Sequence, residues 1–177
     1  MKILKEDIKH LYTEEAIQAR VKEVAQIINK DYVNEELYVI CVLKGAVMFA
    51  ADLVKSLTMP VQMEFIRLSS YGSSTVSSGK VRAVDISLPD LNDKNVLIIE
   101  DIVDTGLTAK FLLDFIDNNF RTKSTKFCSL LDKKCCRKTE IEADYVGFEV
   151  DDKFVIGYGL DYDGQFRNLP YIGYVTL

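Results

Sequence analysis

The chain has 177 residues, of which 48% are hydrophobic, and its 27 acidic and 22 basic side chains give a formal net charge of −5. A chain of this length buries about two thirds of its unfolded surface in one core and is too short for two full domains, so we expect a single domain over residues 1–177. The negative balance disfavours a nucleic-acid partner, and any phosphate ligand should be small and locally held.

The first part of the chain alternates between helical and strand patterns. Thr13 is a candidate N-cap, and the apolar residues that follow recur at helical spacing in TEEAIQARVKEVAQIINKDY (13–32). The continuous apolar run LYVICVL (37–43) is typical of a strand covered on both faces. Helical spacing returns in GAVMFAADLVKSL (45–57), and VQMEFIRLSSY (61–71) predicts the next strand.

The segment SSYGSSTVSSGK (69–80) departs from this pattern. It is rich in Ser and Gly, has few apolar anchors and is long for a connection in so small a domain. Such a composition is typical of a mobile lid or of a floppy surface hairpin, and the residues alone leave both interpretations open.

The second part of the chain continues the alternation. NVLIIED (95–101) predicts a buried strand, TAKFLLDFIDNN (108–119) a helix and STKFCSLLDKK (124–134) a further strand. This order predicts an α/β fold with a mostly parallel sheet and helices on its faces. YVGFEV (145–150) and FVIGYG (154–159) predict short strands that could form a cap over the end of the sheet.

Targeting and cysteine signals are weak. The charged start MKILKEDIKHLYTEE has no signal-peptide core, and no apolar run approaches the ~20 residues of a membrane helix, so we expect a cytoplasmic protein without a membrane partner. No CxxC spacing occurs, and adjacent Cys135 and Cys136 cannot easily clamp a tetrahedral ion. The single histidine, His10, stands alone, so we expect no structural zinc. We expect the four cysteines, which include Cys41 and Cys128, to be buried or incidental thiols.

Acidic, hydroxyl and glycine residues converge in NVLIIEDIVDTGLTAK (95–110). Ligands of open parallel sheets bind beyond the carboxyl ends of the strands, where this segment should lie. Thr105, Gly106 and Thr108 precede a helix and offer N–H groups and hydroxyls, which predicts a cradle for one phosphate. Glu100 and Asp101 would repel a phosphate unless they bind sugar hydroxyls or lie near a magnesium ion. A phosphorylated sugar satisfies both requirements.

Other interpretations of these residues are weaker. The segment lacks the longer glycine-bounded run of a Walker A loop. Asp104-Thr105-Gly106 also spells the aspartic-protease triplet, but a single copy before a helix does not provide two aspartates that share a proton. A haloacid-type phosphotransfer site needs two aspartates one residue apart, whereas Asp101 and Asp104 are separated by two. Acids placed only for the helix dipole would explain Asp104 but not Glu100 and Asp101.

The segment VLIIEDIVDTGLT closely resembles the phosphoribosyl-pyrophosphate motif of type I phosphoribosyltransferases. Further segments, VLKGAVMFAADL, SSYG, LLDKK and DKFVIGYGLDYDGQFRNLPYIG, resemble loops of the hypoxanthine-guanine phosphoribosyltransferases, and the similarity spans roughly residues 37 to 175. The resemblance implies the type I fold: a mostly parallel sheet flanked by helices, a lid loop at about 69–80, and a small hood from the N-terminal residues and about 134–177.

The activity that this resemblance implies is transfer of the 5-phosphoribosyl group from phosphoribosyl pyrophosphate to a 6-oxopurine. Hypoxanthine or guanine would give IMP or GMP and pyrophosphate in purine salvage, with xanthine left open as an acceptor. A non-catalytic regulator that senses phosphoribosyl pyrophosphate with the same fold is the alternative. The family forms dimers and tetramers, so a homodimer or homotetramer is expected.

The resemblance also implies roles for single residues around the sugar phosphate. Asp104 would be the general acid or base at the imidazole nitrogen of the purine. Glu100 and Asp101 would engage the ribose hydroxyls and, together with Asp161, lie at the Mg²⁺ cofactor. The implied 5′-phosphate loop consists of Asp104, Thr105, Gly106, Leu107 and Thr108. Mammalian members have lysine at the position of Leu107, whereas bacterial and some protozoan members look like this chain.

Two further groups of residues follow from the resemblance. The implied pyrophosphate-binding residues are Lys44, Gly45, Ser70, Tyr71 and Arg167. The implied purine-binding residues are Lys133, Phe154, Val155 and Asp161. Lys133 would donate to the 6-oxo group, a contact that excludes adenine because its amino group cannot accept the hydrogen bond.

Some of these assignments have ordinary alternatives. Arg167 could form a surface ion pair, and Lys133 could lie in a solvated turn. The resemblance implies that Phe154 stacks on the base and that the backbone of Val155 reads its edge. The alternative is that both residues simply alternate as in any strand. The family also has a non-proline cis peptide before the lysine that corresponds to Lys44.

Overall fold

The computed structural model describes residues 4–70 and 81–176 and contains two sheets. The larger sheet has six strands, which are, in spatial order, β4 (Val81–Asp85), β3 (Val61–Ser70), β2 (Leu37–Leu43), β5 (Asn95–Val103), β6 (Ser124–Asp132) and β7 (Tyr145–Glu149). The strands β3, β2, β5, β6 and β7 are parallel, and β4 pairs with the end of β3 in the antiparallel direction. The predicted α/β fold with a mostly parallel sheet is confirmed.

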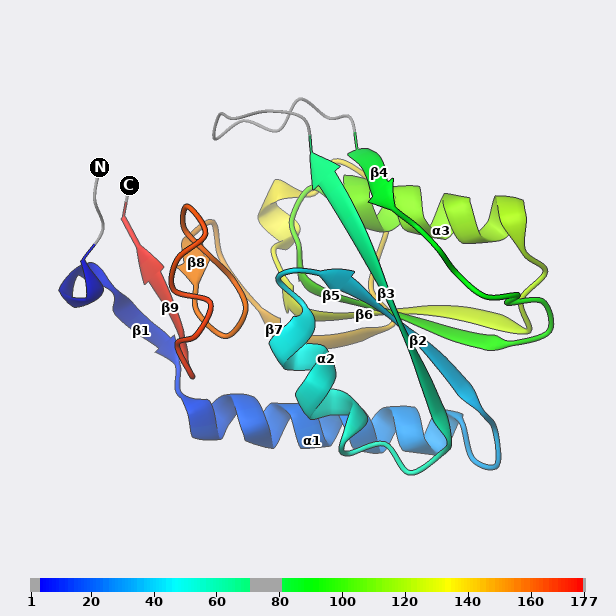
Figure 1. Ribbon diagram of the computed structural model, residues 1–177. Helices are drawn as coiled ribbons and strands as arrows, with labels where there is room; N and C mark the ends of the chain where they lie inside the picture. Colours follow the sequence, from blue (N-terminus) through cyan, green and yellow to red (C-terminus); the bar gives the residue numbers. More distant parts are fainter. Residues whose placement is uncertain (1–3, 71–80, 177) are drawn as a thin grey trace.

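Helices cover both faces of this sheet (Figure 1). The helices are α1 (Glu14–Asp31), α2 (Val47–Val54) and α3 (Leu107–Asn119), with short 3₁₀ turns η1 (Lys5–Asp7) and η2 (Lys134–Cys136). Alternate residues of β2 explain the two layers, because Val39 and Cys41 join the core under α1 and α2, whereas Ile40 and Val42 join the core under α3. The Thr13 hydroxyl accepts a hydrogen bond from the N–H of Ala16 at 3.3 Å, which confirms the predicted N-cap.

The smaller sheet joins the two ends of the described chain. Its antiparallel strands are, in order, β1 (Lys9–Tyr12), β9 (Ile172–Val175) and β8 (Phe154–Ile156). A separate apolar cluster of Ile8, Ile156, Leu169 and Val175 packs beside it. Figure 1 shows this sheet beyond one end of the larger sheet, with β1 and β9 side by side.

Several predicted elements match the structure, and others differ. The patterns at 13–32, 37–43, 108–119 and 124–134 correspond to α1, β2, α3 and β6. The prediction that 145–150 forms part of a cap is wrong, because this segment is β7 and pairs with β6 as an edge strand of the larger sheet. The short strands β1, β4 and β9 were not anticipated as strands. Most of the predicted lid lies outside the described residues.

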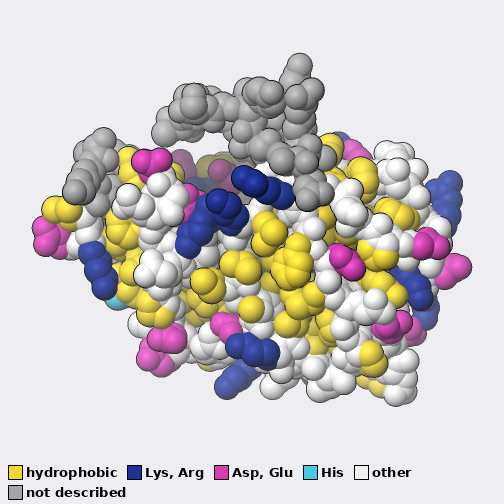
Figure 2. Space-filling model, in the orientation of Figure 1, with side chains coloured by type: hydrophobic (Ala, Val, Ile, Leu, Met, Phe, Trp, Pro, Cys, Tyr) yellow, Lys and Arg dark blue, Asp and Glu magenta, His cyan; other side chains and the backbone are white. Residues whose placement is uncertain are grey.

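The outer edge of β3 is only partly paired among the described residues. β4 pairs with residues 67–70 of β3, so residues 61–66 have β2 on one side and no described strand on the other. Phe65 in β3 is 48% exposed, and Met48 in α2 is 40% exposed. Figure 2 shows hydrophobic side chains gathered on this face, over α2 and β3. We call Met48, Phe65 and the open edge of β3 the apolar face.

Candidate active site

The predicted site residues meet at the carboxyl ends of β2, β5 and β6. These strands are parallel neighbours, so their carboxyl ends share one edge of the sheet. Lys44 follows β2, Glu100 and Asp101 lie in β5, and Lys133 follows β6. The backbone N–H of Lys133 donates to the carbonyl of Val103 at 2.9 Å, which keeps the ends of β5 and β6 together. The topology thus brings together residues that are about 90 positions apart in sequence.

The turn after β2 packs tightly against the rest of the site. The peptide bond between Leu43 and Lys44 is cis, as the resemblance implied. A Cβ added to Gly45 would overlap the carboxylate of Asp101, and a Cβ added to Gly159 would overlap the carbonyl of Gly45. Gly159 also has φ +101°, a conformation that side chains disfavour. Glycine is therefore required at position 159, and a side chain at position 45 would displace the carboxylate of Asp101.

The carboxyl groups of Glu100 and Asp101 lie in a poorly solvated environment. Glu100 is only 6% exposed, and its burial, followed by the neighbouring charge of Asp101, holds its pKa well above its usual range. Burial also raises the pKa of Asp101 to about 6, although backbone hydrogen bonds and the charge of Arg167 oppose the shift. Asp101 Oδ1 accepts a hydrogen bond from the N–H of Ile102 at 3.0 Å. β5 continues to Val103, so both acids belong to the strand itself.

Asp161 and Arg167 form an ion pair next to this acidic pair. Arg167 Nη2 lies 2.5 Å from Asp161 Oδ1, and Arg167 Nη1 donates to the carbonyl of Gly159 at 2.6 Å. The N–H of Gly164 donates to Asp161 Oδ2 at 2.7 Å. The negative charge of Asp161 contributes to the raised pKa of Asp101. Arg167 therefore forms an ion pair, as the alternative interpretation expected, and this pair lies within the candidate site.

The loop from Asp104 to Thr108 turns directly into α3. Gly106 is the N-cap with φ +80°, a left-handed conformation that favours glycine. The Thr105 hydroxyl accepts a hydrogen bond from the N–H of Leu107 at 3.4 Å. Asp104 is exposed, whereas Gly106 is buried. The N–H groups of the first turn of α3 have no intrahelical acceptors, which suits an anion, whereas the exposed carboxylate of Asp104 beside them opposes one.

Arg137 holds this loop through hydrogen bonds to its backbone, a role that the sequence analysis did not predict. Its Nε donates to the carbonyl of Asp104 at 3.2 Å, and its Nη2 donates to the carbonyl of Val103 at 3.5 Å and pairs with the carboxylate of Asp132. Its Nη1 donates to the carbonyl of Ile141. The N–H of Lys138 donates to the carbonyl of Thr105 at 2.9 Å. Arg137 lies in a segment without periodic pattern, so its position in the fold could not be read from the sequence.

Lys133 connects the larger sheet to the smaller one. Its side chain is 10% exposed, which excludes the solvated-turn alternative. Lys133 Nζ donates to the carbonyl of Lys153 at 2.8 Å and lies 3.6 Å from Asp152 Oδ1. Phe154 follows directly in β8, is 37% exposed, and contacts Tyr162 edge-on at 5.7 Å between ring centroids. Val155 is buried at 7% exposure.

Two predicted residues have no described side chain. Ser70 ends β3, whose carboxyl end lies at the same edge of the sheet as that of β2. Tyr71 lies outside the described residues. Their predicted contacts to pyrophosphate therefore stay predictions.

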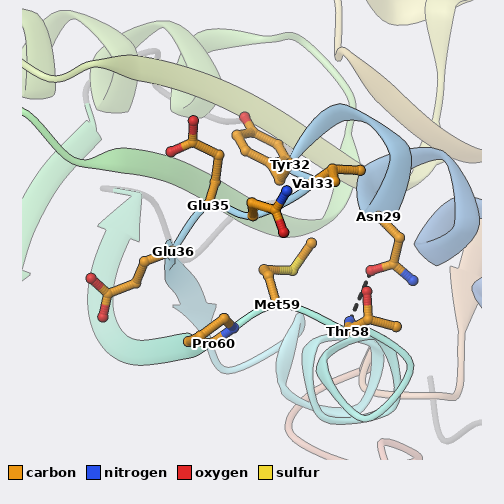
Figure 3. Close-up of a pocket in the computed structure, with 9 residues that line it drawn as sticks. Asn29, Tyr32, Val33, Glu35, Glu36, Thr58, Met59 and Pro60 are labelled. Carbon is orange, nitrogen blue, oxygen red and sulfur yellow. Dashed lines mark hydrogen bonds between the residues drawn. The ribbon is translucent and has the colours of Figure 1, made fainter.

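A separate hollow of about 650 Å³ lies at the opposite, amino-terminal end of β2 and β3 (Figure 3). Its walls come from the end of α1, the residues before β2 and the connection from α2 to β3. The Asn29 amide bridges this connection, because its Oδ1 accepts from the N–H of Thr58 at 2.9 Å and its Nδ2 donates to the carbonyl of Ser56 at 3.0 Å. Glu35 pairs with Lys123 at 2.6 Å. None of the predicted site residues lines this hollow.

Replacing Arg137 tests its role in holding the loop. Arg137→Ala leaves the buried carboxylate of Asp132 without its partner, so we expect the free energy of unfolding to fall by about 3–5 kcal/mol. Lys138→Ala, the matched control, removes an exposed charge next in sequence and should change it by no more than about 0.5 kcal/mol. Urea denaturation of the three proteins measures both values. Equal losses in the two variants would contradict this role.

Replacing Asp101 tests the cost of its burial. The folded protein holds the Asp101 proton up to a pKa of about 6, against an ordinary value of 3.8, so the wild type loses stability as the pH rises between these values. Asp101→Asn removes this loss. Without magnesium or substrate, the variant should match the wild type near pH 4 and exceed its free energy of unfolding at pH 7.5 by on the order of 1–3 kcal/mol. Urea titrations at pH 4, 5, 6 and 7.5 measure this difference. A less stable variant at pH 7.5 would show that the carboxylate is not penalised by burial.

Comparison with known proteins identifies the family. The phosphoribosyl transferase domain family matches residues 7–163. A hypoxanthine-guanine phosphoribosyltransferase of Bacillus subtilis is 47% identical over 97% of this chain and 95% of its own. A crystal structure of a Bacillus anthracis hypoxanthine-guanine phosphoribosyltransferase is 44% identical, with a TM-score of 0.89 over 95% of this chain and 98% of its own. Trypanosoma cruzi hypoxanthine phosphoribosyl transferase is 44% identical, with a TM-score of 0.87 over 95% of this chain and 91% of its own. This chain therefore belongs to the phosphoribosyl transferase domain family and, within it, groups with the hypoxanthine-guanine phosphoribosyltransferases.

Proposed function

We propose that this protein transfers the 5-phosphoribosyl group from phosphoribosyl pyrophosphate to hypoxanthine or guanine, forming IMP or GMP and releasing pyrophosphate. The observation that carries this proposal is the 47% identity to a hypoxanthine-guanine phosphoribosyltransferase over nearly the whole chain. The residues implied for this chemistry also meet at one edge of the sheet, as far as they are described. The reaction serves purine salvage, and xanthine is a third acceptor to test.

The donor would bind across the ends of β2 and β5. The 5′-phosphate would lie in the loop Asp104–Thr108, where the first turn of α3 offers N–H groups. Glu100 and Asp101 would accept hydrogen bonds from the ribose hydroxyls. The pyrophosphate would meet the backbone at Lys44 and Gly45, together with the forked donors of Arg167, Ser70 and Tyr71. These contacts hold the anomeric carbon in place for attack by the purine nitrogen.

The residues around Asp101 fit a magnesium ion. Asp161 raises the pKa of Asp101 through its negative charge, and a cation bound near both would offset this repulsion. No group of three or more His, Cys, Asp or Glu side chains within residues 4–70 and 81–176 forms a ready metal cluster. This suits Mg²⁺, which commonly takes one or two carboxylates and completes its shell with substrate oxygens and water. Bound there with Glu100 as a further candidate, it would neutralise charge on the departing pyrophosphate.

The purine would lie between the larger and the smaller sheet. Lys133 Nζ would donate to the 6-oxo group, Phe154 would stack on the ring, and the backbone of Val155 would read its edge. Lys133 is already oriented by the carbonyl of Lys153. Asp104, exposed at the start of the phosphate loop, would take or give the proton at the imidazole nitrogen of the base.

The alternative of a non-catalytic regulator has no support among the relatives described above, which carry the names of enzymes. The chain also retains Asp104, Lys133 and Phe154, which a sensor of the donor alone would not need. The assay below separates the two functions, since a regulator would bind phosphoribosyl pyrophosphate without forming a nucleotide.

We further propose that the protein is a cytoplasmic homodimer or homotetramer. The apolar face supports association, because exposed Met48 and Phe65 lie beside the unpaired part of β3. The study of the Trypanosoma cruzi relative concerns the role of its C-terminal region in oligomeric state and activity. Among the described residues, no helix has the length and apolar character to span a membrane. Light scattering of the wild type and of Phe65→Lys would measure the association.

The direct test of the function is product formation. The pure protein should convert hypoxanthine and guanine to IMP and GMP when supplied with phosphoribosyl pyrophosphate and magnesium, and should release one pyrophosphate per nucleotide. Parallel assays with xanthine and adenine measure the choice of base, and adenine should give no product because it cannot accept from Lys133. Absence of nucleotide from hypoxanthine, guanine and xanthine would end the proposal.

Replacing Asp104 tests the proton-transfer step. Asp104→Asn should lower kcat by ~10²–10⁴-fold, because the amide cannot exchange a proton with the base, while the KM for phosphoribosyl pyrophosphate changes much less. Asp114→Asn is the matched control, since Asp114 is an exposed residue of α3 that pairs with Lys110 at 3.0 Å. Steady-state kinetics of both variants would decide. An unchanged kcat in Asp104→Asn would remove Asp104 from this role.

A further inference from the structure

Cys135 and Cys136 lie at the site but have no part in the proposed reaction. Both belong to η2, directly after Lys133, and their sulfur atoms are 3.8 Å apart. Cys135 is exposed and Cys136 is partly exposed, whereas Cys41 and Cys128 are buried. The expectation of buried thiols is confirmed for Cys41 and Cys128, whereas for Cys135 and Cys136 the expectation of incidental thiols stays a prediction.

The spacing of the two sulfurs favours a bridging atom over a direct bond. A disulfide has sulfurs about 2.05 Å apart and Cα atoms usually about 4.4–6.8 Å apart, whereas neighbouring Cα atoms are about 3.8 Å apart, so a direct bond between adjacent cysteines is strained. Two sulfurs bound at about 2.3 Å to one pyramidal trivalent atom, at an angle of roughly 100°, lie roughly 3.5 Å apart. The observed distance of 3.8 Å is much nearer to this second geometry than to a disulfide, and a small rotation of the exposed Cys135 side chain closes the difference.

We propose that Cys135 and Cys136 form a dithiol site that captures organic trivalent arsenic compounds, and that its occupation disturbs purine recognition by Lys133. An arsenoxide R–As=O condenses with both thiols. Two As–S bonds form, the oxygen leaves as water with the two thiol protons, and the oxidation states do not change. Such a centre needs two sulfurs and its own organic group, so it requires no third ligand from the protein.

The surroundings suit this condensation. Partial burial, followed by hydrogen bonds with Cys135 and Asp152, raises the pKa of Cys136 to about 12, so Cys136 carries its proton at neutral pH. Thiol–disulfide exchange requires a thiolate and is disfavoured there, whereas the arsenoxide uses the proton to form water. A hollow of about 230 Å³ opens beside Cys135, and Leu11, Tyr12 and Val150 contribute to its walls. Most of its other lining residues are charged, so an aryl group would lie against these three side chains.

One carboxylate oxygen couples the thiols to the purine lysine. Cys136 Sγ donates to Asp152 Oδ1 at 3.5 Å, and Lys133 Nζ lies 3.6 Å from the same oxygen. Arsenic on Cys136 removes the thiol proton and adds bulk between Asp152 and Asp104, whose charge also acts on this thiol. The position of Lys133 should change as a result. This effect on turnover rests on the proposed function, whereas the capture itself does not.

Intact-mass spectrometry with phenylarsine oxide tests the capture. The wild type should gain one phenylarsenic group per chain, which a small dithiol removes and an equal concentration of a monothiol does not. Cys135→Ser and Cys136→Ser each keep one sulfur of the pair as well as Cys41 and Cys128. Each should hold the reagent about 100-fold or more weakly, because the second As–S bond of the pair is intramolecular. Retention within tenfold of the wild type in either variant would overturn the dithiol site.

Kinetics of the modified protein test the coupling. Complete modification should lower kcat/KM for hypoxanthine by about tenfold or more, through the weakened contact of Lys133, and the small dithiol should restore it. Both single-serine variants should resist the loss at the same reagent concentration. If fully modified protein keeps its kcat/KM, the coupling is refuted and the capture stands. If unmodified protein forms no nucleotide, the proposed function fails, and the mass measurements still decide the capture.

Discussion

The burial of two adjacent carboxyl groups in the central strand β5 constrains the whole candidate site. Glu100 and Asp101 are acids in a poorly solvated place, and burial raises the pKa of both. A buried negative charge is unfavourable unless cations or donors compensate it. Arg167 supplies part of this compensation but is itself shared with Asp161. In the unliganded site the carboxyl groups outnumber the cations that compensate them. This imbalance lowers the free energy of unfolding, and it favours the binding of a cation or of sugar hydroxyls.

Close packing around this acidic pair involves two glycines that lie far from it in sequence. Gly45 can contact the Asp101 carboxylate, and Gly159 can contact the carbonyl of Gly45, only because neither has a side chain. These three residues come from the turn after β2, from β5 and from the turn after β8. The contact therefore ties the position of the smaller sheet to the catalytic edge of the larger one.

Local patterns predicted the elements that carry most of the site, because α1, β2, β5, α3 and β6 each have a strong period or a long apolar run. The partners of the short strands could not be predicted in the same way. The segments YVGFEV and FVIGYG are alike in length and composition, yet β7 extends the larger sheet while β8 joins β9 and β1 in the smaller one. Pairing over such distances depends on tertiary contacts that no local pattern specifies.

The same limit applies to single residues. The acids of β5 and the loop Asp104–Thr108 form one contiguous motif, which the sequence makes recognisable. Arg137 contacts the carbonyls of Val103, Asp104 and Ile141, and it has no motif of its own. Backbone carbonyls are present at every residue, so a side chain that binds three of them leaves no signature in the sequence. Only the fold identifies Arg137 as a support of the loop Asp104–Thr108.

The contacts of Lys133 show how a nearly buried cation is held in the fold, and they bear on its proposed contact with the purine. An unpaired ammonium group at this position would be costly, yet a full buried ion pair would compete with the 6-oxo group of a purine. The observed contacts lie between these two cases. Lys133 Nζ donates to the carbonyl of Lys153 at 2.8 Å and lies 3.6 Å from the carboxylate of Asp152, whose side chain is largely exposed. Lys133 is thus held in one direction and keeps donor capacity for a ligand. Cys136 and Lys133 share one oxygen atom of Asp152, and this is the contact through which the proposed modification of η2 would act on the proposed purine site.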